Sequence, residues 1–466
     1  QKVARTYVLY REERKQLRQK QEPQKIENEG INITLENGDE DTLDIKHLEI
    51  MVSEACEGLE DTNAQQIIDE ANKNLYDGVT EEDARTSLVM TARTLVEQEP
   101  NYTYVTARIL LDNIRTEALT YLGMQKQATQ QEMEELYPQA LRNFLAKGVE
   151  NEILNPELLE MDIAKLGKAI TAKRDADFTY LGLQTLYDRY FIHDTEVRYE
   201  LPQVFFMRVS MGLALREENR EEKAIEFYNL LSSFDYMSST PTLFNSGTKH
   251  SQLSSCYLTT VPDDLHGIYG AIQDNAMLSK WAGGLGNDWT PVRGLGSQIK
   301  GTNGKSQGVV PFLKVVNDTA VAVNQGGKRK GAVCSYLETW HVDIEEFVEL
   351  RKNTGDDRRR THDMNTANWV PDLFLKRVSE DKKWTLFTPS DTPDLHDLYG
   401  LEFEKRYEEY EAQTQSGEIE FFKEVEAKEL WKKMLSMVFE TGHPWITFKD
   451  VCNLRSHQQH TCVVHY

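Results

Sequence analysis

The sequence predicts two kinds of fold along one chain, a helical amino-terminal part and an α/β domain after it. Between Leu43 and Leu122 apolar residues recur every three or four positions, which is typical of amphipathic helices, and a second helical block extends to about Phe234. From Ser238 onward glycine becomes frequent, and short apolar runs alternate with helical stretches, as in an α/β domain. At 466 residues the chain exceeds what one hydrophobic core usually supports, so several domains are expected.

Composition and charge narrow the function. The contents of 39% hydrophobic and 28% charged residues argue against wholesale disorder and against a membrane protein. No apolar run approaches the ~20 residues of a membrane-spanning helix, and no signal-peptide core is present, so we expect a cytoplasmic protein with no membrane partner. The net charge of -23 disfavours binding to the phosphate backbone of nucleic acids, so no nucleic-acid partner is expected. Any nucleotide that binds this chain must therefore bind in a pocket.

The cysteines indicate reduced thiols. The five of them are too few and too scattered for a disulfide scaffold, and none forms the C-x-x-C pair that many metal sites use. We therefore predict no metal site in this chain, and any functional cysteine has to be argued from its own surroundings. The cysteines are Cys56, Cys256, Cys334, Cys452 and Cys462.

The helical part begins with a short basic helix, predicted over residues 1–20, and a polar linker over residues 21–30. Another helix is predicted from Leu43, since the apolar positions after it step by three and four; they are Ile45, Leu48, Val52, Ala55 and Leu59.

Three further helices are predicted in the first helical unit, over residues 63–75, 80–96 and 104–122. Thr80 and Asp83 have the spacing of a capping box, which favours a helix start at that point.

A polar run over residues 125–135 separates this unit from the second helical block. In the α/β part, Val309–Val316 and Trp384–Phe387 are apolar runs expected as strands that alternate with helices. The segment 402–429 is dense in charge and contains aromatic residues, and its simplest interpretation is a solvated pair of helices.

Short strings in the α/β part resemble, in order, those of the large (alpha, catalytic) subunit of class I ribonucleotide reductases. One such string would be weak support, whereas the ordered set is specific. The resemblance implies a reductase barrel, a ten-stranded α/β barrel of which residues 236–466 would form the first part. The strings are Ser239-Thr-Pro-Thr-Leu-Phe-Asn-Ser-Gly247, Leu253-Ser-Ser-Cys-Tyr257, Gly294-Leu-Gly-Ser297, Asn324-Gln-Gly-Gly-Lys-Arg-Lys-Gly331, Trp340-His341, Thr388-Pro-Ser-Asp-Thr-Pro393 and Cys452-Asn453.

Upstream, residues 31–122 are similar to the family's ATP-cone, a helical regulatory module, through Asn74-Leu-Tyr-Asp-Gly78 and Tyr104-Val-Thr-Ala-Arg108. Residues 1–20 resemble the tail of a preceding cone, and residues 135–235 the family's helical amino-terminal domain. The family carries a basic residue before the glycine of the cone's opening strand, whereas this chain has Glu36 before Gly38. Because Glu36 would repel phosphate, we expect this cone to be structural more than an ATP sensor.

In the family, a Ser-Asn-Leu-Cys-x-Glu segment with the radical cysteine follows the region that matches residues 452–466. The second redox cysteine, a substrate-phosphate loop and a carboxy-terminal cysteine pair follow later still. None of these is in this sequence, so the resemblance implies an incomplete large subunit that is inactive alone.

The resemblance implies reduction of ribonucleoside diphosphates to deoxyribonucleoside diphosphates by thiyl-radical chemistry. Cys256 matches one of the two redox cysteines, although a lone cysteine is more often a small buried hydrophobic residue. The resemblance implies that Thr242, Ser255 and Gly284 contact the substrate. Their chemistry suits that role, since hydroxyls donate and accept hydrogen bonds and glycine lets a ligand approach closely. Turn capping is the alternative for the two hydroxyl residues. Cys462 is interpreted as incidental.

The resemblance also implies an allosteric specificity site that takes ATP or deoxynucleoside triphosphates. The implied positions are Asp263, Asp264 and Leu265, with Arg293 and Lys300 facing phosphates. Asp264 stands where the family has a hydroxyl residue, and the alternative for the whole group is an acidic turn with exposed cations.

The glycine-rich loop 324–331 would link the effector and substrate sites, with Gln325 and Arg329 contacting the substrate base. A flexible basic hairpin is the alternative. Two nucleotide-binding lookalikes are set aside: Gly301–Ser306 lacks the first glycine of a P-loop, and Gly283–Gly286 lacks the third glycine of a dinucleotide fingerprint.

The implied partners are a small (beta) subunit that generates the radical and holds its cofactor, a second copy of the large subunit, and thioredoxin or glutaredoxin as reductant. A non-catalytic nucleotide-sensing protein derived from the reductase is the main alternative. An enzyme that draws its radical from adenosylcobalamin is a third hypothesis, which the cone modules disfavour.

Overall fold

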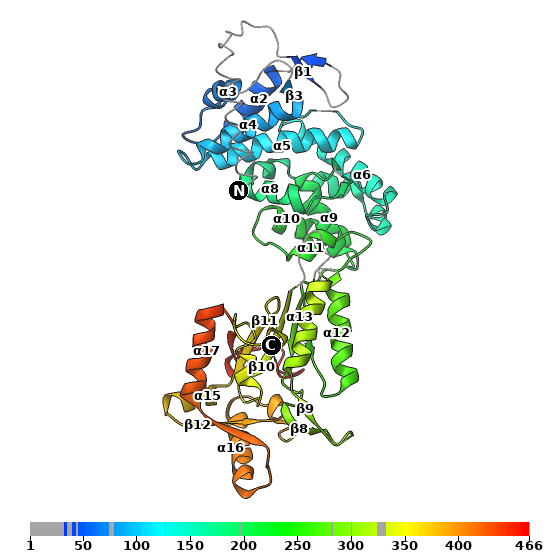
Figure 1. Cartoon of the computed structure of the whole chain (residues 1–466). Helices are drawn as coiled ribbons and strands as arrows, with labels where there is room; N and C mark the ends of the chain where they lie inside the picture. Colours follow the sequence, from blue (N-terminus) through cyan, green and yellow to red (C-terminus); the bar gives the residue numbers. More distant parts are fainter. Residues whose placement is uncertain are drawn as a thin grey trace. The chain divides into compact units, whose positions relative to one another are not determined.

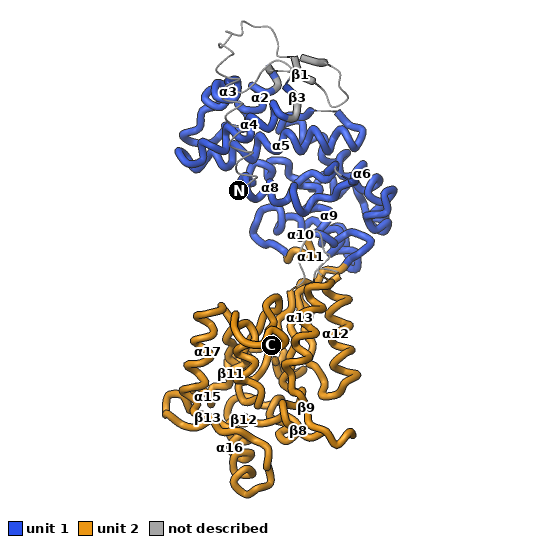
Figure 2. The backbone as a smooth tube through the Cα atoms, viewed as in Figure 1, with its two compact units in different colours: residues 1–238, 244–251 blue, residues 239–243, 252–466 orange. Residues whose placement is uncertain are grey.

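The computed structural model describes residues 32–34, 40–42, 45–73, 79–125, 127–195, 197–280, 283–299, 301–323 and 332–465. The chain divides into two compact units, which Figure 2 shows in different colours. Unit 1 comprises residues 1–238 with 244–251, and unit 2 comprises residues 239–243 with 252–466. The helix predicted over residues 1–20, Glu36, Lys300 and the loop 324–331 lie outside the described residues.

The first part of unit 1 is a helical bundle with a small three-stranded sheet, in the order β2-β1-β3. The helices predicted from residue 43 to residue 122 are confirmed within one to three residues at most ends. The Thr80 side chain accepts a hydrogen bond from the Asp83 amide, as the capping box predicts. The elements are β1 Asn32–Thr34, β2 Glu40–Thr42, α2 Ile45–Cys56, α3 Ala64–Asn72, β3 Val79–Thr80, α4 Glu81–Leu95 and α5 Tyr102–Tyr121.

The second part of unit 1 is a further set of helices packed around α9, which is buried along nearly its whole length. Its elements are α6 Met133–Glu150, η1 Pro156–Glu160, α7 Ile163–Ala169, η2 Ala172–Asp177, α8 Tyr180–Arg189, β4 His193–Asp194, β5 Val197–Arg198, α9 Pro202–Ala214 and α10 Arg220–Ser232. The short helix α11, Thr240–Asn245, follows. Among the described residues, no helix has the length and apolar character needed to cross a membrane.

A buried carboxylate joins the two parts of unit 1. Asp175 is 1% exposed and accepts hydrogen bonds from Arg115 Nη2 of α5 at 2.9 Å and from Tyr137 Oη of α6 at 2.7 Å. Gln203 Nε2 of α9 donates to its other oxygen at 2.9 Å. Because a buried charge must be paired and hydrogen-bonded to be tolerated, this carboxylate fixes three helices to one another.

Unit 2 is built on a five-stranded sheet in the order β14-β11-β10-β7-β6, and every neighbouring pair is parallel. Figure 1 labels two of these strands, β10 and β11, together with the helices α12, α13 and α17 of the same unit. This arrangement of strands and connecting helices is consistent with part of an α/β barrel. The strands are β6 Cys256–Thr260, β7 Gly284–Asp288, β10 Ala332–Glu338, β11 Asn365–Val370 and β14 Trp445–Phe448. The helices are α12 Leu265–Lys280, α13 Val310–Ala322, α14 Ile344–Phe347, α15 Asp372–Ser379, α16 Gly400–Ser416, α17 Ala427–Thr441 and α18 Lys449–Arg455.

One face of this sheet carries the hydrophobic core of unit 2. Leu285 of β7 and Val333 and Leu337 of β10 belong to the same buried cluster as Ile268 of α12 and Leu313 of α13. Since successive residues of a strand point to opposite faces, the intervening residues of β7 and β10 project to the other side of the sheet. The face opposite the hydrophobic core is therefore the one whose side chains could contact a ligand.

Two antiparallel hairpins complete unit 2, namely β8 Leu295–Ile299 with β9 Gly304–Gln307 and β12 Lys383–Phe387 with β13 Phe422–Glu426. The strand predicted at 384–387 is confirmed, but the strand predicted at 309–316 is wrong because this run opens helix α13. Pro311 occupies the first turn of α13, where a proline is favoured, and a short apolar run does not by itself separate a buried helix from a strand.

The solvated helix pair predicted at 402–429 is also corrected. Only α16 is helical throughout, because residues 422–426 form β13 and pair with β12. Tyr407 of α16 is buried, donates to Thr385 O at 2.7 Å and accepts from Thr385 N at 2.7 Å. The aromatic residues of α16, namely Phe403, Tyr407 and Tyr410, therefore belong to the core, whereas Phe422 of β13 is exposed.

We expect Asp175→Ala to lower the free energy of unfolding of unit 1 by about 3–5 kcal/mol, since it leaves the Arg115 guanidinium buried without its carboxylate. Urea denaturation followed by circular dichroism would measure the change. Glu134→Ala is the control, because it removes an ion pair with Lys173 that lies at the surface of the same region. Equal effects of the two substitutions would contradict a structural role for Asp175.

Candidate active site

The register of the parallel sheet brings reactive side chains to the face opposite the hydrophobic core. Cys256 pairs with Gly284, and Gly284 pairs with Ala332. Residues two and four positions further along a strand project to the same side, so Cys334 and Tyr336 of β10 share this face with Cys256. Asp288 of β7 and Glu338 of β10 lie on it at the carboxyl ends of their strands. We call this side the reactive face.

The predicted substrate residues meet at the start of β6. Ser255 O accepts a hydrogen bond from the Gly284 amide at 2.8 Å, and Ser255 Oγ lies 3.7 Å from Cys256 Sγ. Thr242 Oγ1 donates to Leu253 O at 3.2 Å, which ties α11 to the segment that enters β6. The thiol of Cys256 is exposed, so Cys256 is not the small buried core residue that was its alternative.

Two further residues of the reactive face were missed by the sequence analysis. Burial raises the pKa of the Cys334 thiol to about 12, so Cys334 stays protonated at neutral pH. Burial and then the neighbouring Cys334 raise the pKa of Tyr336 to about 12. Only the register could have found these residues, because neither lies in a recognisable motif.

Cys334 is not placed to form a disulfide with Cys256. The strands β6 and β10 are separated by β7. At about 4.8 Å per strand spacing their Cα atoms lie roughly 10 Å or more apart, beyond the ~7 Å that a disulfide allows. Any redox partner of Cys256 must therefore come from elsewhere.

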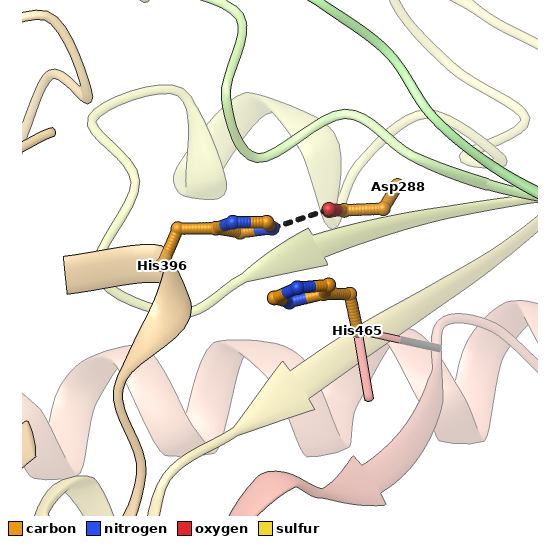
Figure 3. A group of neighbouring side chains, drawn as sticks. All are labelled: Asp288, His396 and His465. Atoms are coloured by element: carbon orange, nitrogen blue, oxygen red, sulfur yellow. Dashed lines mark hydrogen bonds and ion pairs between the residues drawn. The ribbon is translucent and has the colours of Figure 1, made fainter. Parts of the chain in front are cut away.

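A cluster of buried ionisable groups lies where β7 and β10 end (Figure 3). His396 Nε2 is 2.5 Å from Asp288 Oδ2, and the rings of His396 and His465 stack with centroids 3.7 Å apart. Burial would lower the pKa of His396, but hydrogen bonds to Asp288 and Asp397 outweigh it and raise the pKa to about 9. Burial and the charge of His396 lower the pKa of His465 to about 4. An imidazolium thus stacks on a neutral imidazole.

The same cluster holds a buried ion pair. Lys449 Nζ lies 2.7 Å from Glu338 Oε1 and donates to His396 O at 2.8 Å. Trp340 Nε1 donates to the other Glu338 oxygen at 2.6 Å. These contacts attach the start of α18 to the end of β10.

The donor atoms of Asp288, His396 and His465 lie close enough together to suggest a metal site. The ring planes of the two histidines are only 10° from parallel, so their in-plane lone pairs do not converge on one point. His396 Nε2 is also engaged by Asp288, and the ammonium of Lys449 would oppose a second cation. We therefore interpret the cluster as a network of ion pairs that holds α18 and His465 against the sheet.

The predicted effector residues are partly brought together. Arg293 Nε lies 2.9 Å from Asp263 Oδ2, and the Arg293 amide donates to Asp263 Oδ1 at 3.0 Å. Asp264 accepts a hydrogen bond from Gly267 N at 2.9 Å at the start of α12, as a capping turn residue does. Leu265 is 64% exposed at that helix start. Lys300, Gln325 and Arg329 lie outside the described residues.

The two nucleotide-binding lookalikes have no phosphate-binding geometry. Gly301–Ser306 spans the turn between β8 and β9, and Gly283–Gly286 runs into strand β7. Neither segment opens a helix, which a phosphate-binding loop of either kind requires.

A cavity of about 190 Å³ in unit 1 is lined by residues of α2, α5 and the loop before α6. Arg108 on its wall donates to Ala55 O at 3.0 Å and to Glu57 O at 2.9 Å, so it caps the end of α2. Arg115 on the same wall is held by Asp175. None of the predicted substrate or effector residues that the structure describes lines this cavity.

We expect the buried histidine cluster to give unit 2 a pH-dependent stability. Because the pKa of His396 rises from its ordinary 6.5 to about 9 on folding, its contribution is complete below pH 6.5 and is lost as the pH rises through 9. The free energy of unfolding should fall by at most about 1.4 kcal/mol per pH unit across that window. Urea denaturation at pH 6, 7.5 and 9 would measure it.

His396→Gln should flatten this alkaline slope, whereas the exposed control His193→Gln should leave it unchanged. A slope that survives in His396→Gln would show that another group titrates in this range.

Three family models match separate regions of the chain. Residues 31–117 match the ATP cone domain, residues 176–251 match the ribonucleotide reductase all-alpha domain, and residues 254–465 match the ribonucleotide reductase barrel domain. Cys256, Gly284, Arg293 and Asp263 all fall within the barrel match.

Curated relatives align over most of the chain. The ribonucleoside-diphosphate reductase subunit alpha of Chlamydia muridarum is 54% identical over 99% of this chain and 44% of its own length. That of Helicobacter pylori strain 26695 is 40% identical over 93% of this chain and 53% of its own length. The ribonucleoside-diphosphate reductase large subunit of Caenorhabditis elegans is 40% identical over 83% of this chain and 47% of its own length. The chain thus spans about half the length of these relatives and belongs to the ribonucleotide reductase large-subunit family.

Proposed function

We propose that this chain supplies the substrate-binding start of the barrel to an enzyme that reduces ribonucleoside diphosphates to deoxyribonucleoside diphosphates. The observation that carries the proposal is the exposed thiol of Cys256, which begins β6 beside Ser255 and is paired in the sheet with Gly284. A thiol that reduces a ribose must reach the substrate, and this one projects from the reactive face without a covering side chain of the core.

In this proposal Cys256 acts with a second cysteine. Replacement of the 2′-hydroxyl by hydrogen requires two electrons and two protons, which two thiols provide as they become one disulfide, while the hydroxyl leaves as water. The thiyl radical that starts the reaction lies on another cysteine, which the remaining part of a large subunit contributes. Cys334 stays a protonated thiol and takes no electron in this scheme.

The neighbouring groups would bind and orient the sugar. The hydroxyls of Ser255 and Thr242 can each donate and accept, so they suit ribose and phosphate oxygens. Gly284 lies between Cys256 of β6 and Ala332 of β10 in the sheet register. Because glycine has no side chain, the substrate can approach the backbone of β7 closely at this position. Correct placement near the thiol contributes much of the acceleration in reactions of this kind.

We further propose that the β8–β9 hairpin and its surroundings bind a nucleoside triphosphate effector. Arg293 would meet phosphate and Asp263 would meet ribose, with Asp264, Leu265 and Lys300 beside them. The Asp263–Arg293 ion pair keeps both groups in place until an anion competes for the guanidinium. Gln325 and Arg329 would contact the substrate base from the loop that precedes β10.

The ATP cone match supports binding of a nucleotide effector by the first helical unit as well. Whether Glu36 weakens that site stays a prediction. The proposed partners are a small subunit with the radical cofactor, a second large subunit and a thioredoxin or glutaredoxin. The cytoplasmic location, the absence of a metal in this chain, and the domain limits at residues 20, 122, 135 and 235 stay predictions from the sequence.

Complementation tests the catalytic proposal. The chain is mixed with the carboxy-terminal part of the Chlamydia muridarum subunit, a small subunit, an effector and a dithiol reductant, and deoxycytidine diphosphate is measured. We expect turnover only in the complete mixture, and Cys256→Ser should lower it by at least about a thousandfold, because the two-electron step then lacks a thiol.

Cys462→Ser is the matched control and should keep full turnover, since Cys462 is exposed and lies outside the strands of the sheet. Effector binding without turnover in any mixture would favour the regulatory alternative, in which the chain senses nucleotides and performs no reduction.

We expect Arg293→Ala to weaken binding of deoxynucleoside triphosphates to this chain by about 10- to 100-fold, as is typical when one charge-assisted phosphate contact is lost. Isothermal titration calorimetry on the purified chain would measure it. Arg455→Ala, which removes an exposed cation of α18, is the control and should change the affinity less than twofold. Equal losses in the two variants would indicate unspecific attraction of the anion.

A further inference from the structure

One buried carboxylate closes the base of the β8–β9 hairpin. Asp343 is 5% exposed and accepts hydrogen bonds from the backbone of both arms. The Leu295 amide, at the first residue of β8, donates to Oδ1 at 2.8 Å. The Val309 amide, just beyond β9, donates to Oδ2 at 2.9 Å. Each oxygen is therefore committed to a different arm of the hairpin.

His341 fixes the backbone on the other side of Arg293. The Asp343 amide donates to His341 Nδ1 at 3.1 Å, so the ring proton is on Nε2, which donates to Val292 O at 2.8 Å. His341 is fully buried. Residues 292 and 295 are thus both held by the turn 341–343, and Arg293 lies between them.

Thr388, the residue directly after strand β12, adds a third attachment. Its Oγ1 accepts a hydrogen bond from the Gly294 amide at 3.2 Å and another from Ser297 Oγ at 2.8 Å. Segment 292–297 therefore has four hydrogen bonds to the turn and to Thr388, three from its backbone and one from the Ser297 side chain.

The hairpin lies against the turn without any gap. A Cβ atom on Gly294 would lie 2.0 Å from Val342 Cγ1, and one on Gly308 would lie 2.3 Å from Asp343 Oδ2. Gly308 also has a φ of +75°, which disfavours any side chain. Because the backbone contacts the turn closely at both positions, a displacement of the hairpin toward the turn must move the turn with it.

The turn 341–343 follows strand β10 almost directly. Strand β10 carries Cys334, Tyr336 and Glu338 on the reactive face, next to β7 with Gly284. The loop proposed to contact the substrate base ends where β10 begins. The carboxylate of Asp343 is therefore a short, rigid link between Arg293 and the strand that borders the substrate site.

We propose that Asp343 is a positioning residue for the effector, which holds Arg293 in place for a nucleoside triphosphate and transmits its binding to β10. The inference rests on the proposed effector site at Arg293. A phosphate that binds competes with Asp263 for the guanidinium and displaces Arg293. Because the turn 341–343 is hydrogen-bonded to residues 292 and 295, the displacement of Arg293 also moves the turn. Without these hydrogen bonds, only the hairpin would move.

Asp343→Asn tests the proposal, because an amide keeps the size of the side chain but has one oxygen instead of two to accept from the two amides. The matched control is Asp450→Asn in the same unit. Asp450 is 2% exposed and likewise accepts from two backbone amides, Gly400 N and Asp372 N, each at 2.7 Å. It has no contact with the hairpin among the hydrogen bonds described.

Two measurements on the full chain are made with deoxythymidine triphosphate and with ATP. Calorimetry gives the dissociation constant, and hydrogen exchange gives the protection of residues 332–338 with and without the nucleotide. We expect Asp343→Asn to weaken binding at least tenfold and to abolish the nucleotide-dependent protection of β10. Asp450→Asn should bind within twofold of the unmodified chain and keep that protection.

Thr388→Val is used if Asp343→Asn does not fold. It removes the hydroxyl that accepts hydrogen bonds from Gly294 and Ser297, and it should weaken nucleotide binding severalfold. Unchanged binding and protection in Asp343→Asn, or equal losses in Asp450→Asn, would overturn the role of Asp343 and leave the effector site standing. Failure of the unmodified chain to bind either nucleotide would overturn both the effector site and this inference.

Discussion

The candidate active site depends on the parallel register between β6 and β7, which begins at the hydrogen bond from the Gly284 amide to Ser255 O. Because side chains alternate along a strand, a slip of one residue would turn Cys256 toward the hydrophobic core and bring Tyr257 to the reactive face. The core on the opposite face, which includes Leu285 and Val333, is what prevents that slip. Burial of apolar residues on one side of the sheet thus determines which thiol is offered on the other.

Charged groups serve two different purposes in unit 2. At the ends of β7 and β10, Asp288 and Glu338 are paired with His396 and Lys449 in a buried cluster that holds distant segments together. Near the hairpin, Asp263 holds Arg293 in a partly exposed ion pair. The first arrangement is costly to break because its charges have no access to water, whereas the second has that access. The two sets of ion pairs therefore differ in burial more than in composition.

Local sequence patterns predicted the helices of unit 1 and the residues around Cys256, because caps, periodicity and motif strings are encoded within a few positions. The patterns failed where distant pairing decides the structure. Residues 422–426 are charged and look helical, but pairing with β12 makes them a strand. Cys334 and Tyr336 could not be assigned without the register, and His396 meets Asp288 across 108 positions of the chain. Asp343 lies next to the Trp340-His341 string, yet its two partners were beyond any local pattern.

The carboxylate of Asp175 has a consequence for how such modules can be recombined. Its partners Arg115 and Tyr137 come from either side of the polar run that follows α5, and the region matched by the ATP cone ends at residue 117, two positions after Arg115. A cone transplanted from another protein without an arginine at this position would leave the buried Asp175 carboxylate with its hydrogen bonds from Tyr137 and Gln203 but without a counter-charge. The residue at position 115 therefore affects whether an exchanged cone can pack stably against the second part of unit 1. A cone that binds nucleotide well could still destabilise the recombined protein by leaving Asp175 without its ion pair.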